Sequence, residues 1–138
     1  MTPDEMERGV RGYFDSVGRG DRDALRELFA EDLRWRVPQG AIEPYAGLHE
    51  GAQTIIDLML GAVDNAFVPG SQRTEIKNLV YGEDLAVAET QMHAETADGR
   101  KYCNDYTFFF EFREGRISEI REHVDTRYAA NFFAPPPA

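Results

Sequence analysis

The segment KYCNDYTFFFEFREGRISEIREHVD, residues 101–125, decides the fold of this chain. It contains two runs of alternating side chains, and the pair Glu114-Gly115 between them is typical of a tight turn. Alternation with period two indicates a β-strand, because successive strand side chains point to opposite faces. The segment therefore predicts two antiparallel strands, 101–113 and 116–125, joined by a hairpin turn.

Glu122 is the most informative residue of this segment, because it falls on the same strand face as the apolar Ile120 and Val124. A carboxylate that faces a core must be paired, hydrogen-bonded or protonated, since burial of a bare charge is costly. Glu122 is thus either half of a structural ion pair, with Arg34 or Arg36 of an earlier strand as its partner, or a functional acid/base.

The rest of the chain predicts helices followed by strands. Three helical patterns precede residue 72: one from Thr2 to Val17, a short one capped by Asp21 whose apolar face includes Phe29, and one from Gly51 to Val63. The alternating run 33–38 predicts a half-exposed strand, and 72–81 and 85–96 predict two further strands before the hairpin. This order predicts an α+β fold, in which a curved, mostly antiparallel sheet covers a helical layer. We expect one domain over residues 1–133 and a disordered proline-rich tail over 134–138.

Composition narrows the possible partners. The net charge of −10 disfavours binding to nucleic-acid phosphates or to an anionic membrane surface. The sequence shows no signal peptide and no apolar run of membrane-spanning length, and Cys103 is its single cysteine. We therefore expect a cytoplasmic protein. Its three histidines lack ligand spacing, so we expect neither a metal nor another cofactor.

Several local patterns carry a family resemblance. They are Tyr13-Phe14 through Gly20-Asp21 to Leu28–Leu33, the segment Tyr45–Gly51, and Asn104–Ile117 followed by Arg121–Thr126. In this order they resemble the superfamily of nuclear transport factor 2, ketosteroid isomerase and the SnoaL-like polyketide cyclases. The resemblance implies a cone-shaped roll with three N-terminal helices on a curved sheet around an apolar cavity. It also implies a homodimer formed through the outer face of that sheet.

The resemblance bears on the strand 85–96, where Glu89, Gln91 and His93 share one face. By pattern alone this polar face is solvent-exposed, but similarity to epoxide-hydrolase-like members implies that it lies inward. Gln91 replaces an acid of those members, which argues against epoxide hydrolysis. Glu89 and Glu122 would then form a two-carboxylate pocket, with one group protonated and one ionised. His93 is a second proton carrier or a partly exposed strand histidine.

The comparison with ketosteroid isomerase gives a further candidate. Tyr13 matches the tyrosine that holds the oxyanion in that family, but its two aspartates align near Val37 and Phe108. Steroid isomerisation is therefore not expected, although Tyr13 remains a possible hydrogen-bond donor.

Aromatic and amide side chains supply candidates for substrate binding. The aromatic stripe of strand 101–113 forms a core, a ligand-binding wall, or both, and Trp35 has the same two interpretations. Asn104 and the Tyr106 hydroxyl are suited to orient a carbonyl. The predicted substrate-binding residues are Trp35, Gln91, Asn104, Tyr106, Phe108 and Phe110.

These observations predict a cofactor-free acid/base enzyme of the SnoaL-like group, of isomerase, cyclase or dehydratase type. Its substrate would be a small apolar molecule that is cyclic or carries a carbonyl. The predicted catalytic residues are Glu122, Glu89, Tyr13 and His93. Two alternatives remain: a protein that binds a hydrophobic molecule without reaction, and a dimeric protein-interaction module whose cavity is filled by Phe108, Phe110 and Trp35.

Overall fold

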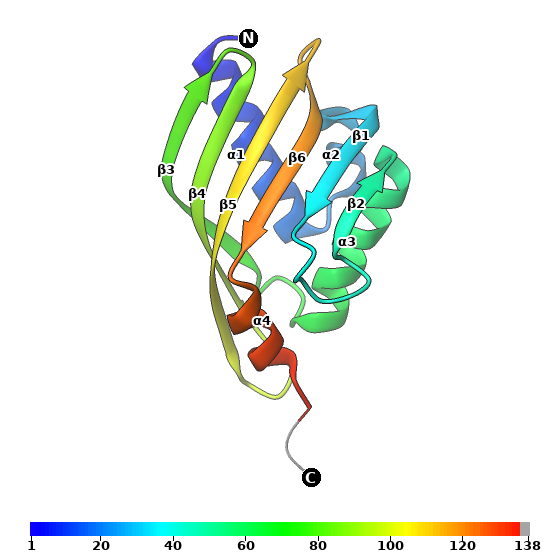
Figure 1. Cartoon of the computed structure of the whole chain (residues 1–138), viewed down its shortest axis with the longest axis vertical. Coiled ribbons are helices and arrows are strands. Elements are labelled where there is room, and N and C mark those ends of the chain that lie inside the picture. Colours follow the sequence, from blue (N-terminus) through cyan, green and yellow to red (C-terminus); the bar gives the residue numbers. More distant parts are fainter. Residues whose placement is uncertain (136–138) are drawn as a thin grey trace.

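Six strands form one curved sheet, and three helices cover one of its faces in the computed structural model, which describes residues 1–135 (Figure 1). The elements are α1 (Pro3–Arg19), α2 (Arg22–Leu28), β1 (Phe29–Val37), β2 (Gly47–Glu50), α3 (Ala52–Ala66), β3 (Arg73–Gly82), β4 (Leu85–Glu95), β5 (Lys101–Arg113), β6 (Arg116–Val124) and α4 (Thr126–Phe133). The strand order is β2-β1-β6-β5-β4-β3. Only β1 and β6 run parallel, so the predicted α+β fold with a mostly antiparallel sheet is confirmed.

The first helix is defined by local signals at both ends. The Thr2 hydroxyl accepts a hydrogen bond from the Glu5 backbone, and the Glu5 carboxylate accepts one from the Thr2 backbone, which is a capping box. Gly20 ends the helix in the left-handed conformation that glycine adopts without strain. The apolar face of α1 is buried and brings Tyr13 and Val17 against the sheet.

The hairpin of β5 and β6 has the predicted strands and fixes which side chains face the helices. Phe110 lies opposite Ile120 and Phe108 opposite Glu122, while on the other side Phe108 lies opposite Ala88 of β4. Phe110 and Ile120 are fully buried in the main core. Glu122 therefore shares the core-facing side of the sheet, as its position between Ile120 and Val124 predicts.

Three local features differ from the sequence-based expectation. The short strand β2 and the helix α4 were not predicted, and Phe29, expected in the second helix, begins β1. α4 starts where the Asp125 carboxylate accepts a hydrogen bond from the Tyr128 backbone. Its aromatic side chains join Phe67 and Tyr102 in a second, smaller core.

The predicted tail, 134–138, lies partly outside the described residues. No helix in the described chain is long and apolar enough to cross a lipid bilayer.

Candidate functional site

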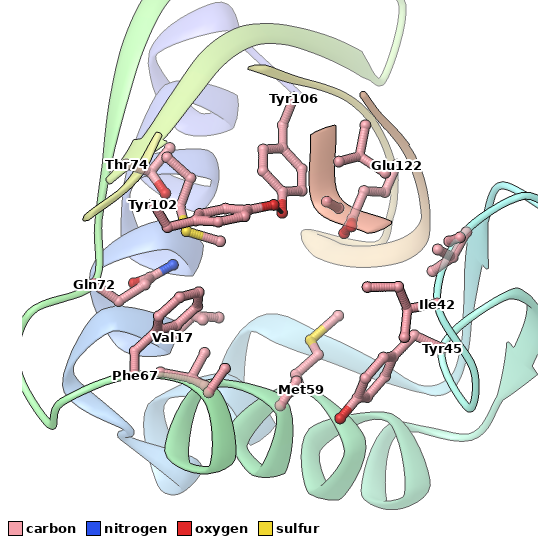
Figure 2. A pocket seen from close by; sticks show the side chains of 18 of the residues that line it. Val17, Ile42, Tyr45, Met59, Phe67, Gln72, Thr74, Tyr102, Tyr106 and Glu122 are labelled. Carbon is pink, nitrogen blue, oxygen red and sulfur yellow. Dashed lines mark hydrogen bonds between the residues drawn. The ribbon is translucent and has the colours of Figure 1, made fainter. Parts of the chain in front are cut away.

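A cavity of about 410 Å³ lies between the inner face of the sheet and helices α1 and α3 (Figure 2). Tyr13 and Val17 of α1 and Met59 of α3 form part of its wall, and Thr126 and Phe133 of α4 line one end. Most of the lining is apolar, as a layer of helices against a sheet produces when their facing sides are hydrophobic. The few polar groups therefore determine what chemistry the cavity can support.

Glu122 is the carboxylate that faces this cavity (Figure 2). Its Oε1 accepts a hydrogen bond of 3.2 Å from the indole Nε1 of Trp35. Burial raises the pKa of Glu122 from its ordinary 4.5 to about 7, and the Trp35 hydrogen bond lowers the pKa by a smaller amount. The alternative of an ion pair with β1 is not observed, because Arg34 lies 3.8 Å from Glu119 instead.

Trp35 is both a wall of the cavity and a hydrogen-bond donor. It is buried on β1, opposite Ile120 of β6, and its ring lies 5.2 Å from the ring of His49. His49 is held in turn by a 2.7 Å contact between its Nε2 and the backbone oxygen of Tyr45. These contacts fix the indole, so its N–H is aimed at Glu122 before any ligand binds.

Two tyrosine hydroxyls form the other polar group of the site. The hydroxyls of Tyr102 and Tyr106 lie 2.8 Å apart, and Figure 2 shows them directed toward the same part of the cavity as Glu122. Asn104 donates from Nδ2 to the Tyr102 hydroxyl at 2.8 Å and to the Asp125 backbone oxygen at 3.1 Å.

The orientation of Asn104 sets the direction of this network. Its Oδ1 accepts from the Asp105 backbone N–H at 2.8 Å, so the amide has one fixed donor side and one fixed acceptor side. A Tyr102 hydroxyl that accepts from Asn104 becomes a better donor to Tyr106. The hydroxyl pair therefore retains one O–H proton that it can donate to a ligand.

Tyr13 stays neutral at the base of the cavity. Its hydroxyl donates to the Sδ of Met59 at 3.8 Å, and a thioether is a weak acceptor that a ligand oxygen can displace. Burial and the nearby Glu122 raise the pKa of Tyr13, and burial likewise raises that of Tyr106. Both phenols therefore remain protonated donors near neutral pH.

The inward orientation expected for Glu89, Gln91 and His93 is wrong. Glu89 lies opposite Thr107 on the outer face of the sheet, exposed, and accepts a 2.7 Å hydrogen bond from Asn78. On the same face the Gln91 amide reaches Asp105 at 3.3 Å, and His93 Nε2 lies 3.6 Å from Glu75. Glu89 and Glu122 therefore do not share a cavity.

The reason lies on the inner face of β4. Ala86, Ala88 and Thr90 are buried there, and small side chains leave the space that α1 and the β5 aromatics occupy. The solvent-facing interpretation of the polar face, which alternation alone supports, is the correct one.

Apart from Gln91, which lies on the outer face, the predicted binding residues divide into three groups. Trp35, Tyr106 and Phe108 line the cavity, whereas Phe110 is fully buried in the core beside it. Asn104 is also buried and acts on the cavity only through the Tyr102 hydroxyl. Tyr102 was missed, although its position four residues before Tyr106 places it on the same strand face.

Residues of other elements were missed because no local pattern singles them out. Gln72 lies directly before β3 and Thr74 near its start, and Met59 comes from a helix that is apolar on most sides. Within residues 1–135, no group of three His, Cys, Asp or Glu side chains is placed to hold a metal ion.

Comparison with known proteins agrees with this architecture. A solved NTF2-like protein of unknown function from Burkholderia pseudomallei K96243 is 20% identical, covers 97% of this chain and 100% of its own, and has a TM-score of 0.81. Bal32a from a soil-derived mobile gene cassette is 25% identical over 96% of this chain and 98% of its own, with a TM-score of 0.79. A proposed SnoaL-like polyketide cyclase from Jannaschia sp. CCS1 is 18% identical over 99% and 98%, with a TM-score of 0.81.

No curated protein sequence matches the chain. The family described as SnoaL-like domain matches residues 10–120, which is most of the fold described above. The chain therefore belongs to the SnoaL-like domain family, and it shares its fold with solved NTF2-like proteins.

Proposed function

We propose that this protein is a cofactor-free acid/base enzyme that acts on a small apolar molecule that is cyclic or carries a carbonyl. The observation that carries the proposal is Glu122, a carboxyl group inside an apolar cavity whose pKa is raised to about 7 by burial. A group with that pKa is present both as base and as acid at neutral pH, which is the condition for efficient proton transfer.

The neighbouring donors support a reaction at a carbonyl. The Glu122 carboxylate takes a proton from the carbon beside the carbonyl, and the C–H electron pair becomes an enolate. The spare O–H of the Tyr102–Tyr106 pair donates to the oxygen on which the negative charge develops. Return of the proton to another carbon completes an isomerisation. If the enolate carbon instead attacks a second carbonyl, the proton goes to the new alkoxide and a ring is closed.

The test is α-proton exchange in deuterated buffer, with 2-tetralone as the probe and NMR as the readout. The wild-type protein should exchange the probe's α-protons faster than buffer alone. Glu122→Gln should slow the protein-dependent rate by about 10²-fold or more, because the amide cannot take a proton. Glu89→Gln, the matched change on the outer face, should leave the rate unchanged. If Glu122→Gln exchanged the α-protons of the probe at the wild-type rate, the proposal would be contradicted.

A second candidate is a protein that binds an apolar molecule without reaction, which the apolar lining of the cavity favours. It predicts that mass spectrometry finds an unchanged hydrophobic compound released from the purified protein, and that no α-proton exchange occurs. The alternative of a protein-interaction module requires that Phe108, Phe110 and Trp35 fill the cavity, whereas a cavity of about 410 Å³ remains between the sheet and the helices.

The proposed reaction requires no disulfide or other oxidised cysteine, so it is compatible with a reducing compartment. We propose that the protein works in the cytoplasm.

A further inference from the structure

Gln72 presents a polar group to the cavity far from the proposed reacting centre. It lies directly before β3 and is only 9% exposed. Figure 2 shows its amide on the wall opposite Glu122, with the nitrogen directed into the cavity and the apolar Val17 and Phe67 close by.

The Gln72 amide is not satisfied by the protein itself. Its Oε1 is buried and has no hydrogen-bond partner among the described residues. An unsatisfied amide in such a place destabilises the folded state, whereas an apolar side chain of similar size would not. Packing alone therefore does not explain why a glutamine stands at this position.

Gly18 shows that the fold makes room for this amide. A Cβ atom at Gly18 would lie 3.1 Å from Gln72 Oε1 and 3.1 Å from the Gln72 backbone oxygen. Gly18 lies inside α1 with ordinary helical geometry, so a glycine is not needed there for backbone conformation. The missing side chain of Gly18 provides space, which the backbone oxygen and the amide oxygen of Gln72 both occupy.

Thr74 lines the same wall, two residues further along the chain. Residues two apart on an extended strand project from the same face, so its hydroxyl and the Gln72 amide are hydrogen-bonding groups on one wall of the cavity. A half-turn of the terminal amide exchanges its oxygen and nitrogen at almost the same points, so the pair can donate or accept.

We propose that Gln72 and Thr74 form a second polar subsite, which binds a hydroxyl or carbonyl oxygen at the end of the substrate remote from Glu122. The assignment of the reacting end to Glu122 rests on the proposed function. The inference narrows the substrate class to molecules that are apolar in the middle and polar at both ends.

The experiment compares two probes that differ at one end, 6-hydroxy-2-tetralone and 6-methyl-2-tetralone. Dissociation constants are measured from the NMR signal of the Trp35 indole N–H, because Trp35 is the only tryptophan and lines the cavity. Wild-type protein should bind the hydroxyl probe about tenfold more tightly, which is the size of effect expected from one satisfied buried hydrogen bond.

Gln72→Leu should reduce this ratio to about 1, while Gln91→Leu, the matched change on the outer face, should retain it. Gln72→Leu replaces an unbonded amide by an apolar group of similar size, so the variant should fold, and its melting temperature checks this. The proposal is overturned if the wild-type protein shows no preference, if it fails to bind the hydroxyl probe at millimolar concentration, or if Gln72→Leu keeps the preference.

The binding ratio does not depend on turnover, so the two proposals can fail separately. If the ratio behaves as expected while the wild-type protein exchanges no α-protons, the subsite stands and the acid/base function fails. If exchange is observed but the ratio is about 1 in wild type, the function stands and the subsite fails.

Discussion

Glu122 illustrates how the environment of one residue creates a candidate acid/base. Its carboxylate is partly buried in the wall of an apolar cavity, receives one hydrogen bond from Trp35, and has no cation within salt-bridge distance among the described residues. Desolvation therefore outweighs the single stabilising contact, and the pKa rises. Had the carboxylate paired with Arg34, as the alternative interpretation allowed, the pKa would have moved the other way.

The raised pKa of Glu122 predicts how stability changes with pH. In the folded state the group stays protonated up to about pH 7, whereas in the unfolded chain it ionises near 4.5. The folded state therefore binds more protons between these values, and the free energy of unfolding falls as pH rises from 4.5 through 7. The difference between the folded and unfolded pKa values corresponds to a loss of at most about 3 kcal/mol in the free energy of unfolding. This loss is complete above pH 7.

Glu122→Gln should remove this loss, because the introduced amide is neutral at every pH and can still accept from Trp35. Urea unfolding at pH 4 and pH 8 provides the measurement. Wild type and variant should be equally stable at pH 4, and the variant should be the more stable at pH 8 by up to about 3 kcal/mol. Equal stability at both values would show that the carboxyl group is solvated in the folded protein.

Trp35→Phe should raise the pKa of Glu122 further, because the lost indole N–H favours the ionised form. The midpoint of the pH profile for α-proton exchange should move upward by about one pH unit, since a hydrogen bond to a charged group contributes about 1.5 kcal/mol or more. A merely structural role for Trp35 would lower the rate without moving the midpoint.

Residue-level prediction succeeded where apolar neighbours fixed the face of a strand. Ile120 and Val124 oriented Glu122 correctly, because large β-branched side chains mark the buried face. On β4 the inner face carries Ala86 and Ala88, whose small size gives a weak signal. Alternation there still favoured the polar face as the solvent-exposed one, and the resemblance overrode this signal and gave the wrong orientation for Glu89.

At the scale of elements, α4 is the feature that the sequence did not predict. An eight-residue helix is marginal in isolation, so its existence depends on contacts made elsewhere. Its Phe132 ring lies 5.0 Å from the Tyr102 ring, and Arg100 donates to the Phe132 backbone oxygen at 2.7 Å. These partners are distant in sequence, which is why local patterns could not reveal the helix.

Asp125→Ala should loosen α4 by removing its N-terminal cap. Loss of such a cap costs about 1 kcal/mol, so amide hydrogen exchange over residues 126–133 should become about fivefold faster. Asp21→Ala, which removes the cap of α2, is the control and should leave exchange in α4 unchanged. Unchanged protection of α4 in Asp125→Ala would mean that the aromatic contacts alone hold the helix.

At the scale of the whole molecule, helices followed by an antiparallel meander were predicted from turn signals and alternation, and the strands β3 to β6 lie within one or two residues of the expected ranges. The parallel pairing of β1 with β6 was not predicted, because it joins residues at least 85 positions apart in the chain. Long-range pairing of this kind closes the cavity, so a complete description of the site required the three-dimensional structure.

We propose that the outer face of the sheet forms a homodimer, as expected from the resemblance. Val80, Val87 and Phe109 lie opposite one another across β3, β4 and β5, and Val80 is 58% exposed. Val87 and Phe109 are partly buried, and a partly exposed apolar row of this kind is typical of an interface. Wild-type protein should sediment as a dimer and Val80→Glu as a monomer, with Glu89→Gln as the control that stays dimeric. A monomeric wild-type protein would contradict this proposal.

A carboxyl-carbon NMR titration measures whether Glu122 is a desolvated carboxyl group ready for proton transfer. The Glu122 signal is identified as the one that disappears in Glu122→Gln. A desolvated Glu122 should titrate with a midpoint of about 7. A midpoint at or below the ordinary 4.5 would show a solvated or ion-paired carboxylate and would contradict the acid/base role.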